Sequence, residues 1–188
     1  MVEIRWHGRG GQGAKTASQL LAMAGLITGQ SVQAFPEYGP ERSGAPMQAY
    51  NRADATRIRR HDGVRTPGYV VVLDESLLAE AEVVKGLSPR GLFIVNTEQP
   101  PAEVRARTGY GGTVWCVPAD RIARRCQSRY ANVVLVGALA RALVDIPLAV
   151  LEEATREILG ARLSASALEA SLRAVREGFA WAERRLVA

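Results

Sequence analysis

The sequence predicts an α/β protein, a three-layer α/β/α sandwich around a mostly parallel sheet, because short apolar runs alternate with longer helical stretches. YVVVL at residues 69–73 and GLFIVN at residues 91–96 are continuous apolar runs, which are typical of strands covered on both faces. The stretches between and after them repeat apolar residues at helical spacing. The 188 residues, 47% of them hydrophobic, suffice for one core, so we expect a single domain over residues 1–188 with a Rossmann-like sheet.

The first part of the chain predicts two strands around one helix, followed by a loop. Strands are expected at Val2–His7 and Ser31–Phe35, and a helix with one apolar face is expected between them at Ala14–Thr28. The next stretch, PEYGPERSGAP (Pro36–Pro46), holds three prolines and two glycines. Proline breaks both helices and strand ladders, so this stretch is predicted to be an irregular loop.

The rest of the chain continues the alternation. Met47–Ala53 and Thr56–Arg60, separated by a short polar link, are predicted to be two strands that pair as an antiparallel insertion. Three further strands are expected at Tyr69–Leu73, Gly91–Asn96 and Thr113–Val117. Five helices are expected at Glu75–Lys85, Ala119–Ser128, Asn132–Leu143, Pro147–Leu159 and Ala165–Arg185. Pro147 suits a first turn, and Ser164 is a candidate cap of the last helix.

The positive charge of the chain is almost entirely arginine. The net charge is +5, and Lys15 and Lys85 are the only lysines. Arginine favours planar, bidentate partners such as phosphates and carboxylates. Two explanations of this bias stay open. One is a genome that favours arginine codons, and the other is docking on an acidic protein surface or a phosphorylated ligand. Because the basic residues are scattered and aromatic residues make up 6%, we expect no nucleic-acid partner.

The cysteines and the apolar runs indicate which metal sites the chain can form and where in the cell it is expected. Cys116 and Cys126 form no CxxC motif and have no clustered histidines, which argues against an iron–sulfur cluster or structural zinc held by this chain. They are predicted to be reduced cysteines in or near the core. No signal peptide or membrane span is expected, so the chain is predicted to be cytoplasmic with no membrane partner.

The stretch IRWHGRGGQGAKTAS nearly fits two nucleotide-binding patterns. Gly8, Gly10 and Gly13 satisfy G-x-G-x-x-G between a predicted strand and a predicted helix, as a dinucleotide turn requires. That turn also needs an acidic residue at the end of the second strand to hold a ribose hydroxyl. The strand SVQAF ends in Phe35, and Glu37 falls in the predicted loop, so the dinucleotide interpretation is weakened.

The phosphate-loop pattern G-x-x-x-x-G-K-[ST] fails by one position. Ala14 stands where the lysine belongs, and Lys15 and Thr16 are each shifted by one residue. One residue on a helix is a rotation of about 100°, which aims the lysine and the hydroxyl away from the β- and γ-phosphates. An anion-friendly turn before a helix N-terminus remains, from which Arg9 and Gln12 are expected to project. The alternative is a turn that only lets strand and helix pack closely.

Six blocks in order over almost the whole chain carry a family resemblance. They are GRGGQGAKTASQLLA, VQAFPEYGPERSGAPMQAYNR, YVVVLDESLL, GLFIVNT, VPADRIA and NVVLVGALARAL. Together they resemble the gamma subunit, or corresponding domain, of the 2-oxoacid:acceptor oxidoreductases, the pyruvate:ferredoxin oxidoreductase superfamily. The resemblance implies a complex that converts a 2-oxoacid, coenzyme A and an oxidised acceptor to acyl-CoA, carbon dioxide and a reduced acceptor.

The resemblance also implies where the cofactors and partners lie. Thiamine diphosphate, Mg and the iron–sulfur clusters are expected on partner subunits, with no cofactor bound by this chain alone. The partners implied are thiamine-diphosphate-binding alpha and beta subunits and a ferredoxin-like delta subunit, with a flavin subunit as a further option. The identity of the 2-oxoacid, the physiological acceptor, the stoichiometry and a direct contact with coenzyme A stay open.

The resemblance implies a rigid glycine turn that faces the assembled active-site region and helps shape the coenzyme A approach. The cofactor-binding candidates match its first two blocks and are Gly8, Arg9, Gly10, Gly11, Gln12, Gly13, Tyr38, Gly39, Pro40, Glu41, Arg42 and Ser43. Glu41 and Arg42 suit either a functional role on a stiffened loop or an internal salt bridge. Lys15 departs from the small or apolar residues expected there, and its role stays open.

No catalytic or metal-ligating residue is expected in this chain. His7 and His61 have no serine or cysteine nucleophile arranged around them, and Asp74 and Glu75 suit the start of a helix better than an acid–base pair. We therefore expect an accessory gamma subunit. The alternatives are an independent nucleotide-binding enzyme that uses the glycine loop, or a pure assembly scaffold.

Overall fold

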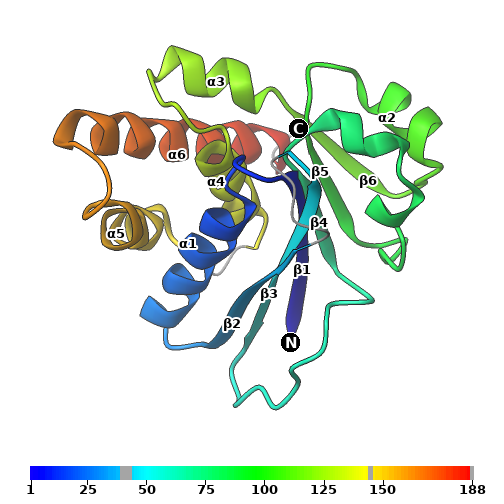
Figure 1. Cartoon of the computed structure of the whole chain (residues 1–188), viewed down its shortest axis with the longest axis horizontal. Coiled ribbons are helices and arrows are strands. Elements are labelled where there is room, and N and C mark those ends of the chain that lie inside the picture. Colours follow the sequence, from blue (N-terminus) through cyan, green and yellow to red (C-terminus); the bar gives the residue numbers. More distant parts are fainter. Residues whose placement is uncertain (39–43, 144–145, 187–188) are drawn as a thin grey trace.

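The protein is a six-stranded mixed α/β fold, described here from a computed structural model over residues 1–38, 44–143 and 146–186 (Figure 1). The strands run in the order β2-β3-β1-β4-β5-β6. Their bounds are β1 Val2–Arg9, β2 Ser31–Tyr38, β3 Pro46–Asp54, β4 Tyr69–Val72, β5 Leu92–Asn96 and β6 Thr113–Val117. The helices are α1 Ala14–Ile27, α2 Pro101–Thr108, α3 Ala119–Arg125, α4 Asn132–Ala142, α5 Leu148–Leu159 and α6 Ala165–Leu186.

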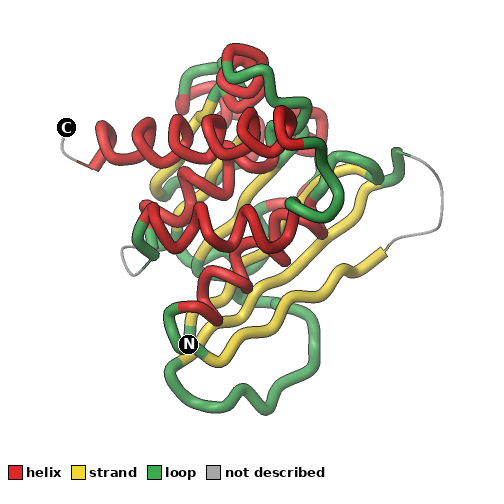
Figure 2. The backbone as a smooth tube through the Cα atoms, turned by 90° about the vertical axis from the view of Figure 1, so that its left-hand side faces the viewer, coloured by secondary structure: helices red, strands yellow, loops and turns green. Residues whose placement is uncertain are grey.

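Helical layers cover both faces of the sheet, which confirms the predicted α/β fold. Helices α1, α4, α5 and α6 pack on one face, and α2 lies on the other, as Figures 1 and 2 show. Alternate strand residues divide between two cores: Val71 and Ile94 face the thick layer, whereas Val70 and Phe93 face the thin one. The strands β1, β4, β5 and β6 are parallel to one another, as the continuous apolar runs predicted.

The antiparallel insertion exists, but its predicted partner was wrong. β3 pairs antiparallel with both β1 and β2, from Val2 opposite Ala53 to Arg9 opposite Pro46 on the β1 side. Thr56–Arg60 is not a strand. The backbone N–H and the hydroxyl of Thr56 both donate to Asp54 Oδ1 at 2.8 Å, and this Asx turn ends β3 before a hairpin can form.

The loop predicted for Pro36–Pro46 begins later than expected. Strand β2 continues through Pro36, which lies opposite Ala49, and ends at Tyr38. β2 is an edge strand, where a missing backbone N–H is tolerated, and Pro46 is the first residue of β3, another position that proline can occupy. Residues 39–43, the centre of the predicted loop, lie outside the described part of the chain.

The helix predicted at Glu75–Lys85 is wrong. Two short 3₁₀ helices, η1 Glu75–Ala79 and η2 Ala81–Val83, stand in its place. The buried Arg5 side chain of β1 donates to three carbonyl oxygens at 2.7–3.2 Å, those of Glu82, Val83 and Lys85. Arg5 therefore ties the end of this stretch to β1, and the stretch forms two short 3₁₀ helices where one continuous α-helix was expected.

In the helical layers, one helix was not predicted and one predicted helix cap is confirmed. Helix α2 was not predicted, since its only buried residue is Val104 and it shows little apolar periodicity. The predicted cap of α6 is confirmed, because Ser164 Oγ accepts from Ala167 N at 3.3 Å. No helix in the described ranges combines the length and the apolar character that a membrane crossing requires.

Candidate functional site

The glycine loop, residues 8–13, connects the carboxyl end of β1 to the start of α1. Gly11 and Gly13 have φ of 92° and 84°, in the left-handed region that favours glycine. Gly13 also has no room for a side chain, because a Cβ there would lie 2.5 Å from Asn132 Nδ2. The same Nδ2 donates to the carbonyl of Gly13 at 3.0 Å. The loop is therefore fixed both by its own conformation and by the start of α4.

The two polar side chains of the loop turn towards the protein. Gln12 Oε1 accepts from Arg9 N at 2.7 Å, and Gln12 Nε2 donates to Asp74 Oδ2 at 2.7 Å. Arg9 Nε lies 3.3 Å from the same Asp74 oxygen, and Arg9 Nη2 donates to Ser76 Oγ at 2.8 Å. Arg9 and Gln12 thus brace the loop against the end of β4, and about a third of the Arg9 side chain stays exposed.

Asp74 is held as a carboxylate. Burial works to raise its pKa, but hydrogen bonds from Ser76 and Gln12 and the charge of Arg9 outweigh burial and leave the pKa below its usual value. Asp74 also accepts from Ser76 N at 2.9 Å, as the cap of η1. The start-of-helix interpretation of Asp74 is therefore confirmed in the form of a short 3₁₀ helix.

The two blocks that supplied the candidate residues meet at one edge of the sheet. Gly8 lies opposite Met47 of β3, and Met47 lies opposite Tyr38 of β2. Beyond the strands, Gly10 N donates to Ala45 O at 3.0 Å, and Arg9 Nη1 donates to the carbonyl of Gly44 at 3.3 Å. Of the candidate residues in the second block, only the backbone of Tyr38 is described, and Gly39, Pro40, Glu41, Arg42 and Ser43 lie outside the described residues.

A polar cleft of about 670 Å³ opens beside the loop at the carboxyl ends of β4, β5 and β6. Ligands of open α/β sheets bind at such ends. Asn96 forms the floor, since its Nδ2 donates to Leu73 O at 3.0 Å and to Asp120 Oδ2 at 2.9 Å. Exposed arginines line the cleft at Arg121, Arg124 and Arg129. We call this the first cleft, and sequence reasoning found none of these lining residues.

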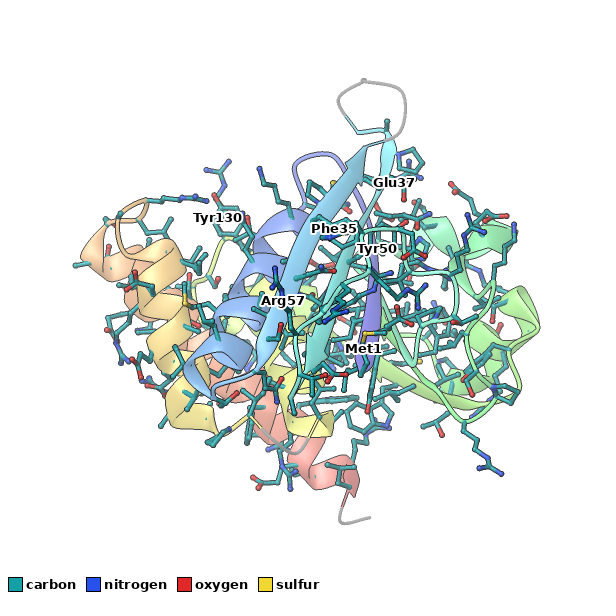
Figure 3. All side chains as sticks on the ribbon, turned by 90° about the horizontal axis from the view of Figure 1, so that it is seen from below. Met1, Phe35, Glu37, Tyr50, Arg57 and Tyr130 are labelled. Carbon is teal, nitrogen blue, oxygen red and sulfur yellow. The ribbon has the colours of Figure 1, made fainter. Side chains whose placement is uncertain are left out.

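A second cleft, of about 390 Å³, lies on the other side of the loop, over the start of α1. No side chain caps this helix, so its first N–H groups are available to an anion. Lys15 and Arg162 line the second cleft and supply positive charge. Tyr130 lines both clefts, and Figure 3 shows it beside α1. Asn132 Oδ1 is buried without a hydrogen-bond partner among the described residues.

The titratable groups near the site are structural. Burial, with the charge of Arg5, lowers the pKa of His7 to about 3, so the ring is neutral and its Nε2 accepts from Arg5 Nε at 2.9 Å. Burial raises the pKa of the Cys116 and Cys126 thiols. Within the described ranges, no three His, Cys, Asp or Glu side chains gather in a way that could hold a metal ion.

The fold and the site together define an α/β protein with a rigid glycine loop between two clefts. The sequence matches the pyruvate ferredoxin/flavodoxin oxidoreductase family over residues 3–181. The chain belongs to this family, in which it is a gamma subunit of the pyruvate/2-oxoacid:ferredoxin oxidoreductase type. The resemblance carried by the six sequence blocks is confirmed.

Two relatives match this chain over nearly their full length. The pyruvate synthase subunit PorC of Thermotoga maritima is 45% identical over 178 residues, 94% of this chain and 92% of the relative. The common subunit gamma of the pyruvate/ketoisovalerate oxidoreductases of Pyrococcus furiosus is 39% identical over 181 residues, 95% and 96% of the two chains. A crystal structure of the Thermotoga maritima pyruvate oxidoreductase subunit PORC has a TM-score of 0.83, at 42% identity over 95% of each chain.

Proposed function

We propose that this chain docks on the thiamine-diphosphate-binding subunits of a 2-oxoacid:acceptor oxidoreductase and shapes the approach of coenzyme A. The thiamine diphosphate supplies the decarboxylation chemistry, and it and the iron–sulfur clusters belong to the partner subunits in this proposal. Residues 1–188 act as one domain of a cytoplasmic complex. The observation that carries the proposal is the braced glycine loop with an open cleft on each side.

The second cleft has the chemistry to accept a phosphate group of coenzyme A. The uncapped start of α1 presents backbone N–H groups, and the positive end of the helix dipole adds to the charge of Lys15 and Arg162. Gly10 and Gly11 are exposed, so a ligand can reach the loop backbone without meeting a side chain. Arg9, fixed by Asp74 and Ser76, keeps this backbone in place.

In this proposal the chain acts only in the second half of the reaction, the formation of acyl-CoA. In this proposal the partner subunits hold the thiamine diphosphate that supports decarboxylation, and the neutral His7 of this chain is already used by Arg5. Decarboxylation therefore proceeds on the partner subunits, and this chain orients the thiol of coenzyme A towards them. The contributions assigned to it are binding, orientation and exclusion of water.

The experiment compares two reactions of the complex with and without this chain. Decarboxylation of the 2-oxoacid in the absence of coenzyme A should proceed in a subcomplex of the partner subunits, whereas formation of acyl-CoA should require this chain. If the chain joins the complex but both reactions proceed equally well without it, it is an assembly scaffold. If it never co-purifies with the thiamine-diphosphate subunits, the docking proposal fails.

A further inference from the structure

A strongly basic loop occupies the end of the molecule opposite the glycine loop. Residues 55–67, here called the basic loop, connect the end of β3 to the start of β4 and contain the run TRIRRHDGVR. Asp54, just before it, pairs with Ser31 at the start of β2, so the loop begins at the amino end of the parallel strands. Figure 2 shows it as the long green segment beside the N-terminus.

The backbone of the basic loop is pinned to the sheet at several points. Gln33 Nε2 donates to Arg60 O at 2.8 Å, and Ile58 N donates to Ser31 Oγ at 3.3 Å. Val64 is buried, and its carbonyl accepts from Arg5 Nη1 at 3.4 Å. The loop lacks regular secondary structure but is held in one conformation.

A fully buried arginine contributes to this pinning. Arg52 is 0% exposed, and its guanidinium donates to Glu3 Oε1 at 2.8 Å, to Asp62 Oδ1 at 3.3 Å and to Gly63 O at 3.4 Å. Breaking a buried charge pair is costly, because it leaves an unpaired charge in the interior. Arg52 therefore locks the basic loop onto β3.

Three arginines of the basic loop do not help to hold the loop in place. Arg57, Arg59 and Arg65 are exposed, and within the described ranges their side chains make no hydrogen bond or ion pair. Arg60 differs, because Asp62 and Glu3 lie 2.7 Å and 3.6 Å from its guanidinium and offset its charge. Because the backbone of the basic loop is already pinned, little backbone freedom remains to be lost when its three unpaired guanidinium groups bind a partner.

The surroundings favour a protein surface as the ligand. Figure 3 shows Arg57 beside β2. The nearby rings of Phe35 and Tyr50 pack on each other with centroids 5.2 Å apart, and Arg52 lies over Phe35, so neither ring is free to stack on a nucleic-acid base. Guanidinium groups form bidentate contacts with carboxylates. Three exposed arginines on one loop fit a carboxylate-rich surface.

We propose that the basic loop is a docking element that binds a carboxylate-rich surface of another subunit of the same complex through Arg57, Arg59 and Arg65. This inference rests on the proposed function, because that function supplies the partner. It assigns a division of labour within the chain, with docking charge at the amino ends of the parallel strands and ligand handling at the carboxyl ends.

The test uses a charge-reversed variant, Arg57→Glu/Arg59→Glu/Arg65→Glu, and a matched control, Arg90→Glu/Arg125→Glu/Arg184→Glu. The control arginines are also exposed and have no side-chain partner in the described part of the chain, and both variants change the net charge equally. Association with the subcomplex of the remaining subunits is measured by biolayer interferometry at several salt concentrations. Circular dichroism checks that each isolated variant folds.

The basic-loop variant should bind at least tenfold more weakly and more slowly, and it should lose the salt dependence of the wild type, whereas the control should bind like the wild type. Surface charges act mainly on association rate and salt dependence. A photo-crosslinker in place of Arg57 should attach to another subunit, and one in place of Arg184 should not.

Four outcomes would overturn the proposal. If the basic-loop variant binds like the wild type, the loop is not a docking element, although the proposed function stands. If both variants lose binding equally, only net charge matters. If the wild-type chain does not associate with the other subunits at all, or if reversal abolishes binding to a DNA duplex and leaves assembly intact, the partner has been wrongly identified.

Discussion

Asn132 at the start of α4 donates from Nδ2 to the carbonyl oxygen of Gly13, 3.0 Å away, across 119 positions of the sequence. A Cβ on Gly13 would lie 2.5 Å from the same nitrogen. The contact therefore requires glycine at position 13, and it joins the start of α1 to the start of α4 at the point where the two clefts meet.

We expect Gly13→Ala to destabilise the protein more than Gly11→Ala. Both positions have positive φ, and holding alanine there costs about 1–3 kcal/mol. At Gly11 nothing lies within 4 Å of the added Cβ, whereas at Gly13 Asn132 must move, at a further cost of about 1–3 kcal/mol. Urea unfolding followed by circular dichroism measures both variants.

The control variant removes the Asn132 side chain that an added Cβ at position 13 would meet. In an Asn132→Ala background the two alanine variants should become similarly stable, because the atoms that Gly13→Ala meets are gone. If Gly13→Ala is no more destabilising than Gly11→Ala in the wild-type background, the packing of Asn132 on Gly13 does not constrain the loop.

The buried His7 predicts a loss of stability on acidification. Its pKa is about 3 in the folded protein, below the ordinary value of 6.5, so the unfolded chain binds more protons between these values. The stability from a neutral His7 is fully present above pH 6.5 and is lost as the pH falls towards 3, with a slope of at most about 1.4 kcal/mol per pH unit.

His7→Gln should flatten this pH dependence, because the glutamine oxygen can accept from Arg5 without titrating. His61→Gln is the matched control, since His61 is exposed on the basic loop, and it should keep the wild-type profile. Free energies of unfolding between pH 4 and pH 8 test this. Identical profiles for the wild type and His7→Gln would show that His7 does not govern acid stability.

Sequence patterning predicted those parts of the fold that burial alone decides. The parallel strands are apolar throughout because both faces are covered, and a run such as YVVVL shows this directly. The helix expected at Glu75–Lys85 is replaced by two short 3₁₀ helices whose end is tied to β1 by Arg5, far away in the sequence, and no local pattern contains that contact. Helix α2 did leave a signal: Pro101 in its first turn and Gly109 with φ of 69° at its end.

Only part of the candidate site could be proposed from the sequence, because only part of it forms a motif along the chain. A glycine motif can be read along the chain, so the sequence alone names residues 8–13 as candidates. Asn132, Tyr130 and Asn96 reach the same place only through the fold, and single polar residues of this kind carry no motif. The brace between Arg9 and Asp74 also needed the structure, since it depends on the parallel pairing of β1 and β4.

The isolated chain should be colourless, free of iron and thiamine diphosphate, and inactive towards 2-oxoacids. The sequence has two cysteines without a CxxC motif, and both are buried, so iron has no set of thiolate ligands. ATP and NAD should not bind, because Lys15 is displaced from the phosphate-loop position. Glu37 lies near the end of β2 and not in the loop where it was expected, but β3 separates β2 from β1 and its glycine loop, and Glu37 already accepts from the Tyr50 hydroxyl. A stoichiometric iron–sulfur absorption band would contradict the first expectation, and micromolar binding of ATP or NAD in calorimetry would favour an independent nucleotide-binding enzyme.

Substitution of Arg9 or Arg42 tests whether the two candidate blocks form one site. Arg9 Nη1 donates to the carbonyl of Gly44, so it supports the segment that holds Arg42 as well as the glycine loop. Charge-assisted contacts contribute about 1.5–3 kcal/mol when well formed. In the assembled complex, Arg9→Ala and Arg42→Ala should each raise the apparent KM for coenzyme A by roughly tenfold or more, since about 1.4 kcal/mol corresponds to one decade.

Decarboxylation measured without coenzyme A should change little in either variant, because it precedes the entry of coenzyme A. Arg156→Ala is the control, since Arg156 pairs with Glu152 at 3.2 Å on α5, and it should leave both reactions as in the wild type. A rise in the coenzyme A KM with decarboxylation intact separates a role at the coenzyme A site from a loss of assembly, which would slow both reactions together. If both variants assemble normally and keep the wild-type coenzyme A dependence, these arginines only hold the two loops together, and the coenzyme A site must be sought elsewhere in the complex.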